Sequence, residues 1–281
     1  MGKHLHPAWR FVIRFASFAL LGLCLAYVWV SLSELDLGNL AAQLDWLDWV
    51  GVIAASIAYG AALILLATGW YRMAAPGRSI RTTEILALYG PGALAKYLPG
   101  SVFQYVSRQV MGKRLDIGQA GMAKASVAEA GLHVIVVVTL AGPLVAGWAT
   151  VALPVYALVA MVLLLRPSGA LVAAIALQLL FFCVFAVIVM LLCQLGPQIQ
   201  DHSRMVGFFF IAWVAGFLVP VAPGGIGVRE AVLLAIASPV EMPASIAFVA
   251  LITRLVNILG DALLGLGGYW AAMREKRQAS G

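Results

Sequence analysis

Charged residues are scarce in this sequence. Asp, Glu, Lys and Arg make up 11% of its 281 residues, whereas hydrophobic residues make up 63%. A water-soluble globular domain carries about a quarter charged residues, so there are too few here to cover a water-exposed surface. The low charge therefore excludes a soluble globular protein and indicates an integral membrane protein.

Cysteine is almost as rare, with three copies in the chain. Cys24, Cys183 and Cys193 lie within apolar segments and lack the spacing of metal ligands or of a disulfide framework. No Lys-Ser/Thr pair follows the glycine-rich stretch "GGIG", as a nucleotide-binding loop requires, and no nucleophile, histidine and acid form a catalytic arrangement. We therefore expect no metal, no cofactor, no nucleic-acid partner and no enzyme activity.

Long apolar runs make up most of the remaining sequence. They lack the alternation of barrel strands, so they predict transmembrane helices of about 20 residues in an all-α membrane protein. The N-terminal run is too long for a cleaved signal sequence, and we expect it to remain as the first helix. Six full crossings are predicted, at residues 11–32, 50–70, 122–141, 148–165, 170–194 and 246–271.

Residues 33–49 predict a different kind of helix, lying in the outer membrane interface. Trp46 and Trp49 supply the aromatic side chains that gather at membrane surfaces. The apolar face of this helix is formed by Leu37, Leu40, Leu44 and Leu47.

Two further apolar segments, 83–110 and 205–238, are interrupted by "YGPGALAKYLPGS" and "VPVAPGGIG", so that each half is too short to cross a bilayer. Lys and Arg collect in cytoplasmic loops. If the N-terminus is cytoplasmic, the basic loops fall on the cytoplasmic side and the acidic loops on the outer side only when each interrupted segment enters and leaves the membrane on the same side. We predict two re-entrant hairpins, 83–110 from the cytoplasm and 205–238 from outside, in the plasma (inner) membrane with both termini cytoplasmic.

The order of crossings and hairpins then occurs twice with opposite orientation. Residues 11–141 run crossing, crossing, inward hairpin, crossing, and residues 148–272 repeat this order from the other side. This is the pattern of an inverted-topology repeat within a single membrane domain.

The two Pro-Gly breaks predict a binding site. Non-helical backbone at membrane depth is tolerated only inside protein or beside a wet cavity, so the breaks should meet inside the molecule. Half-helices that begin there direct N–H groups and a positive dipole end at the cavity, which favours an anion such as a lipid phosphate. Lys96, Arg108 and Arg229 would add full charges. A single break beside an arginine is more often a packing feature, but a matched pair favours a site.

Ionisable residues within the predicted crossings form a second set. A charge at the bilayer centre costs at least about 2.5 kcal/mol, so these groups should face the protein interior and pair with one another. We expect Glu129 to pair with Arg254. The alternative is interhelical packing, worth about 0.6 kcal/mol for each polar contact. The predicted network comprises Glu129, His133, Arg254, Asn257 and Asp261.

Two sequence blocks resemble a known family. "AKYLPGSVFQYVSRQVMGKRLDIG", followed by an acidic residue in the next helix, and "APGGIGVREAVLL" are similar to signature blocks of the flippase-like transmembrane domain of lysylphosphatidylglycerol synthases and of related short stand-alone proteins. The resemblance implies a domain that moves a lipid between leaflets. It assigns headgroup binding to Pro99, Gly100 and Arg108 in the first block and to Pro223, Gly224, Gly225, Gly227, Arg229 and Glu230 in the second.

The expected function is therefore lipid translocation without lipid aminoacylation, because a basic tail follows the last helix in place of a soluble transferase domain. Movement would be downhill or coupled to an ion gradient, with Glu129, His133 or Asp261 as proton carriers. Two alternatives remain open: a small-anion secondary transporter, and a non-transporting subunit that partners a glycosyltransferase or lipid-modifying enzyme of the cell envelope.

Overall fold

The computed structural model describes residues 44–79, 81–97, 103–114, 116–165, 168–219 and 222–279, and within these ranges the chain is all-α, with no strand. The helices in chain order are α3 (Trp46–Ala74), α4 (Thr82–Ala95), α5 (Phe103–Arg114), α6 (Gln119–Val145), α7 (Ala149–Leu165), α8 (Ala170–Leu192), α9 (His202–Leu218), the 3₁₀ turn η1 (Pro223–Gly225), α10 (Val228–Ala237) and α11 (Pro243–Ala279).

Four helices are long and apolar enough to cross a membrane: α3, α6, α8 and the part of α11 up to Met273. They coincide with the crossings predicted at 50–70, 122–141, 170–194 and 246–271. The crossing predicted at 148–165 corresponds to α7, whose 17 residues extend only about 26 Å, less than the hydrocarbon core of about 30 Å. The first predicted crossing, 11–32, lies outside the described residues.

The start of α3 corrects one predicted boundary. Asp45 caps the helix: its carboxylate accepts a hydrogen bond from the Asp48 amide at 2.9 Å, and the Asp48 carboxylate accepts one from the Asp45 amide at 3.0 Å. This reciprocal capping box starts the helix at Trp46. Trp46 and Trp49 therefore belong to the same helix as the crossing, not to a separate interfacial helix, and residues 33–43 lie outside the described part.

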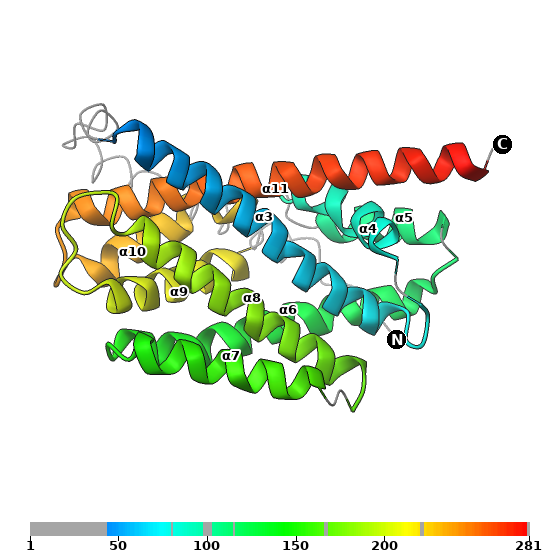
Figure 1. Cartoon of the computed structure of the whole chain (residues 1–281), viewed down its shortest axis with the longest axis horizontal. Coiled ribbons are helices and arrows are strands. Elements are labelled where there is room, and N and C mark those ends of the chain that lie inside the picture. Colours follow the sequence, from blue (N-terminus) through cyan, green and yellow to red (C-terminus); the bar gives the residue numbers. More distant parts are fainter. Residues whose placement is uncertain are drawn as a thin grey trace, which may run out of the picture.

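Each interrupted segment contains two helices; the turn η1 lies between the second pair, and most of the residues between the first pair lie outside the described part. In the first, α4 packs against α5, and in the second, α9 packs against α10. These two helical hairpins, α4–α5 and α9–α10, lie toward opposite ends of the molecule, while α3, α8 and α11 run between the ends (Figure 1).

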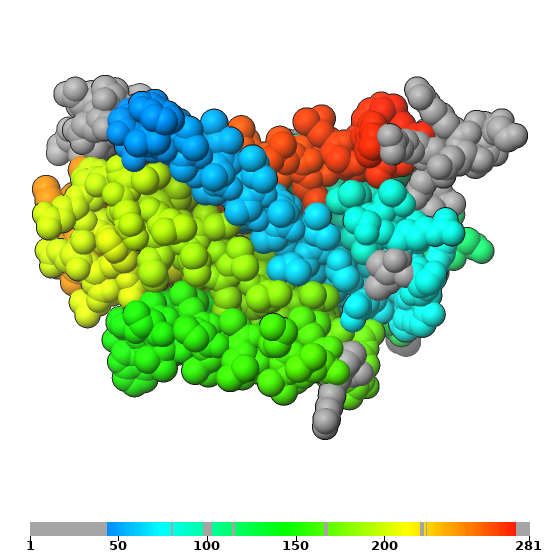
Figure 2. Space-filling view, in the orientation of Figure 1, coloured from blue at the N-terminus to red at the C-terminus, as the bar shows by residue number. Residues whose placement is uncertain are grey.

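The helix contacts follow the same pattern in both halves. The first helix of each hairpin packs against the last long helix of the other half, α4 on α11 and α9 on α6. The second helix of each hairpin packs against the long helix that follows it in the chain, α5 on α6 and α10 on α11. Helix α3 packs on α8. Helix α7 packs against α8 and α6 and forms a band along one edge of the molecule (Figure 2).

Small residues allow the closest of these contacts. Gly60 of α3 lies against Gly260 of α11, and a Cβ added at Gly60 would be 3.0 Å from the Gly260 carbonyl oxygen. Gly90 of α4 meets Gly268 of α11, where an added Cβ would approach the Gly268 Cα to 2.9 Å. Small side chains let helix backbones approach in this way where lipid supplies no hydrophobic driving force between them.

The α4–α11 contact generates a stability prediction. A Cβ at Gly268 would lie 2.4 Å from the Leu86 carbonyl oxygen, whereas a Cβ at the adjacent Gly267 would meet nothing within 4 Å. We expect Gly268→Ala to destabilise the protein by about 1–3 kcal/mol through overpacking. Gly267→Ala, the matched control, should be neutral or stabilising by up to about 1 kcal/mol through helix propensity. Thermal unfolding in detergent measures both, and equal melting temperatures for the two variants would refute the prediction.

Candidate functional site

A cavity of about 140 Å³ lies between the two helical hairpins. Residues of α3, α6, α8 and α11 complete its wall. Its volume is close to that of the engineered cavity of about 150 Å³ that holds one benzene molecule. The cavity therefore has room for a headgroup phosphate but not for the body of a lipid. Its polar lining includes Lys96, Gln104, Arg108, His133, Arg229, Asn257 and Asp261.

The second break meets the C-terminal end of α4 at this cavity. The Gly224 amide donates a hydrogen bond to the Lys96 carbonyl at 3.1 Å, which joins the second hairpin to the first. Gly224 has φ of +58°, and a Cβ there would lie 3.1 Å from the Tyr97 ring, so both conformation and space require glycine. Pro99 and Gly100 lie outside the described residues, and Pro223 begins η1.

The glycine amides of the second break already have acceptors within the protein. Besides Gly224, the Gly225 amide donates to the Ala222 carbonyl at 2.9 Å, and the Gly227 amide donates to Glu230 Oε2 at 2.8 Å. Glu230 thus caps α10 and occupies the positive end of its dipole. The sequence spacing of Gly227 and Glu230 is that of a capping box. In this conformation a guest anion depends on cationic side chains, not on these three amides.

Two close ion pairs replace the pairing expected from the sequence. Arg108 Nη1 lies 2.5 Å from Glu129 Oε2, and Arg254 Nη2 lies 2.6 Å from Glu230 Oε1. The second contact is an ion pair by distance but lacks the angle of a hydrogen bond. The predicted Glu129–Arg254 pair is therefore wrong. Each residue pairs with the second helix of the preceding hairpin, because α5 packs on α6 and α10 packs on α11.

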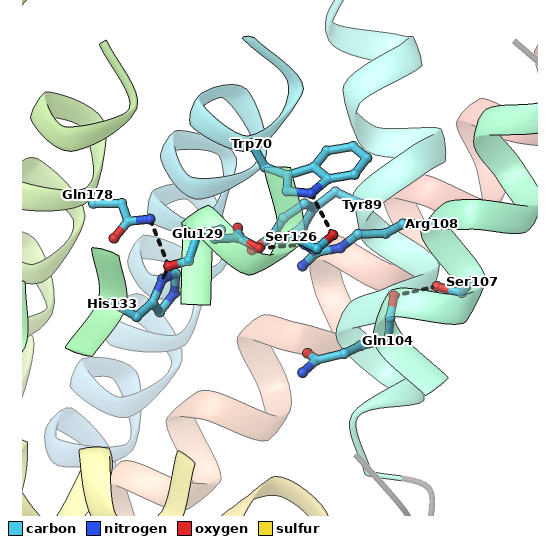
Figure 3. A network of polar contacts seen from close by, with 9 residues as sticks. All are labelled: Trp70, Tyr89, Gln104, Ser107, Arg108, Ser126, Glu129, His133 and Gln178. Atoms are coloured by element: carbon cyan, nitrogen blue, oxygen red, sulfur yellow. Dashed lines mark hydrogen bonds and ion pairs between the residues drawn. The ribbon is translucent and has the colours of Figure 1, made fainter. Parts of the chain in front are cut away.

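Aromatic residues that the sequence analysis missed surround the Arg108–Glu129 pair. The Arg108 guanidinium lies 3.8 Å from the centre of the Tyr89 ring and 5.2 Å from that of Trp70. The Tyr89 hydroxyl donates to Glu129 Oε1 at 2.8 Å, and the Gln178 amide donates to the Glu129 carbonyl at 3.3 Å (Figure 3). Tyr89 and Gln178 lie far from Glu129 in sequence, so no local pattern could have identified them.

A third ion pair anchors the tip of the first hairpin. Asp261 in the middle of α11 is fully buried, and its Oδ2 lies 2.6 Å from Lys96 Nζ. The same oxygen accepts a hydrogen bond from the Tyr97 hydroxyl at 2.6 Å. Tyr97 is a further site residue that the sequence analysis missed. These contacts place Asp261, which was expected in the charge network, beside Lys96, which was expected in the headgroup site.

His133 contacts the second hairpin through aromatic stacking. Its ring stacks on Trp213 and Phe217 of α9, with centroids 5.9 and 5.6 Å away. Its Nδ1 lies 2.7 Å from the Glu129 carbonyl oxygen. Because a carbonyl can only accept, Nδ1 must carry the hydrogen, and Nε2 is then the acceptor of the neutral ring. His133 and Asn257 are both buried and both line the cavity, His133 from α6 and Asn257 from α11.

The charges around the cavity do not cancel. Among the described residues, the four cations Lys96, Arg108, Arg229 and Arg254 face the three carboxylates of Glu129, Glu230 and Asp261, which leaves one positive charge in excess. Arg229 is buried and lines the cavity, and its Nε lies 3.9 Å from Glu230 Oε1, a carboxylate oxygen that Arg254 approaches more closely. The arrangement is suited to one negatively charged group beside Arg229.

Comparisons with protein-family models, curated proteins and solved structures found no match to this chain. Within the described residues, no group of three or more His, Cys, Asp and Glu side chains is arranged to hold a metal ion. The site therefore has to be interpreted from its own geometry.

The Arg108–Glu129 pair generates a second prediction. Both side chains are buried, so Glu129→Gln leaves Arg108 without a counter-charge and should destabilise the protein by about 3–5 kcal/mol. The double variant Arg108→Met/Glu129→Met removes both charges and should be less destabilised than the sum of its two single variants. Lys113→Gln, an exposed position on α5, is the control. Unfolding in detergent measures all five variants, and strict additivity would contradict the pairing.

Proposed function

We propose that this protein is a membrane lipid translocase that moves an anionic, phosphate-bearing lipid between leaflets. The observation that carries the proposal is the cavity between the meeting tips of two helical hairpins, with one positive charge in excess. A cavity of this size accepts the headgroup phosphate while the acyl chains remain in the bilayer. No ATP-binding motif is present, so we expect movement to be downhill or coupled to an ion gradient.

The membrane topology in this proposal has six crossings and two re-entrant hairpins in an inverted repeat, with both termini cytoplasmic in the plasma (inner) membrane. The helix contacts support the repeat, because exchanging the two halves maps α4–α11 onto α9–α6 and α5–α6 onto α10–α11. The ion pairs follow the same exchange with reversed charge. The first hairpin carries Arg108 opposite Glu129, and the second carries Glu230 opposite Arg254.

Exposed apolar side chains next in sequence to lining residues are consistent with a lipid as the guest. Each of the four directly precedes or follows a residue that lines the cavity, and acyl chains can lie against apolar side chains. The four residues are Leu94, Phe103, Leu218 and Ile226.

The mechanism that we propose uses the hairpins as the moving parts. The phosphate binds beside Arg229 and Lys96, and rocking of one repeat against the other exposes it to the opposite leaflet. The resemblance of the two Pro-Gly blocks to the flippase-like domain of lysylphosphatidylglycerol synthases supports the same function. The alternatives, a small-anion transporter or a non-transporting partner of an envelope glycosyltransferase or lipid-modifying enzyme, predict different outcomes in one assay.

Reconstitution in vesicles tests the proposal. Purified protein is placed in vesicles with fluorescent phosphatidylglycerol, and the fraction accessible to an external quencher is followed with time. Wild type should accelerate exchange between leaflets. Arg229→Ala should slow it about ten- to a hundredfold, the loss of one charge-assisted hydrogen bond of roughly 1.5–3 kcal/mol. Arg229→Lys should retain part of the activity.

The matched control is Lys124→Ala, which removes an exposed charge at the start of α6, and unchanged melting temperatures confirm folding. Flux of phosphate or sulfate without any lipid exchange would identify an anion transporter. If wild type moves neither lipid nor anion, including a polyprenyl-phosphate probe, the translocase proposal fails and the subunit alternative stands.

A further inference from the structure

The Lys96–Asp261 pair differs from the two other close ion pairs at the site. Arg108 and Glu129 are both almost completely buried, and Arg254 and Glu230 are nearly so. The Lys96 side chain is 26% exposed, although its partner Asp261 is fully buried. Lys96 caps the end of α4, at the hairpin tip and on the cavity wall. It is therefore the cation best placed to turn from a protein carboxylate toward a guest.

Asp261 is only half satisfied by its partners. Its Oδ2 receives both Lys96 and the Tyr97 hydroxyl, whereas Oδ1 is buried without a hydrogen-bond partner among the described residues. The Asn257 side-chain oxygen, one turn earlier on α11, is also buried and unpartnered there. An ion pair taken out of water gains little unless its remaining polar atoms are satisfied. Lys96 therefore loses little by exchanging Asp261 for another anion.

Whether Lys96 pairs with Asp261 or with a guest anion affects the contact between the two hairpins. The Lys96 carbonyl accepts the hydrogen bond from the Gly224 amide, and Tyr97 packs against Gly224. In the structure as it stands, Asp261 holds this joint to α11 through Lys96 and Tyr97. If Lys96 bound a guest instead, one of the two contacts between the joint and Asp261 would be lost. Binding would then loosen the first hairpin tip from α11.

The charge balance at the site supports this exchange. One positive charge is in excess among the described residues there, so a phosphodiester with one negative charge neutralises it. After the exchange Asp261 keeps the hydrogen bond that the Tyr97 hydroxyl donates to it.

On the basis of the proposed function, we propose that Asp261 is an internal competitor of the substrate: it binds Lys96 in the empty site and is displaced from Lys96 by the phosphodiester of the incoming lipid. Return of Lys96 to Asp261 then helps to release the phosphate, so Asp261 is a positioning residue for transport.

The test separates competition from a structural role by the sign of an affinity change. Asp261→Asn in nanodiscs should bind phosphatidylglycerol more tightly by about two- to fivefold, because a partly exposed ion pair is worth about this factor. Its rate of lipid exchange in vesicles should fall, because release is slower. Asp261→Glu keeps the competing charge, so any gain in affinity should be smaller than that of Asp261→Asn. Lys124→Ala, at an exposed position on α6, is the control expected to stay near wild type. Weaker or unchanged binding by Asp261→Asn overturns the proposal.

A measurement on the wild type covers the case in which Asp261→Asn does not fold. Lys96 is one of five lysines, so selective ¹⁵N labelling of lysine side chains gives few resonances. The Lys96 signal, assigned by its loss in Lys96→Arg, should shift when phosphatidylglycerol is added and shift less with its free headgroup, glycerophosphoglycerol. An equal shift would show that the phosphodiester alone displaces Asp261, which also supports the exchange. A signal that neither probe moves overturns it.

These outcomes distinguish the inference from the function on which it rests. If the wild type exchanges lipid but Asp261→Asn binds no more tightly, the competition proposal alone is wrong. If the wild type neither exchanges nor binds lipid, the translocase proposal fails and the competition proposal fails with it.

Discussion

The interior of this protein is organised by one constraint: a buried charge or a broken helix needs a partner within the protein, because hydrocarbon supplies none. The contacts at the centre of the molecule follow from it. Glu230 caps the helix that begins after the second break, Gly224 donates to the first hairpin, and Asp261 holds Lys96. The second break and the end of α4 are thus held by groups at or beside the cavity. The site and the joint between the hairpins are the same set of contacts.

The two charge-reversed ion pairs occupy corresponding places in the two helical hairpins, yet the site between the hairpins is asymmetric. Arg108–Glu129 and Glu230–Arg254 both fasten the second helix of a hairpin to the long helix that follows it. The first helices of the hairpins instead pack on the opposite half, so the hairpins interlock. Among the described residues, two additional cations, Lys96 and Arg229, face one further carboxylate, Asp261. The excess charge is therefore located between the two hairpins, where the proposed function requires an anionic headgroup to bind.

Much of this arrangement could be predicted from sequence. Hydropathy located the four long apolar helices, and the Pro-Gly blocks located both breaks, because lipid tolerates interrupted backbone only within protein. Eight of the predicted site residues line the cavity: Lys96, Arg108, His133, Gly224, Gly225, Arg229, Asn257 and Asp261. The partners of the charges could not be predicted. Glu129 was assigned to Arg254 because both lie in corresponding helices, but a pair also requires that the two helices be adjacent and turned toward each other.

The aromatic contacts show the same limit. Tyr97 reaches Asp261 across 164 positions of the chain, and Tyr89 reaches Glu129 across 40. The sequence by itself determined the class of protein, the helix breaks and the residues able to carry charge in a membrane, since these depend on local composition and on the solvent that each segment can tolerate. Only the tertiary structure decided which charges cancel and which remain, because pairing depends on helix rotation and approach. A difference of a few ångströms between two helices decides whether a cation forms an ion pair within the protein or is available to a guest.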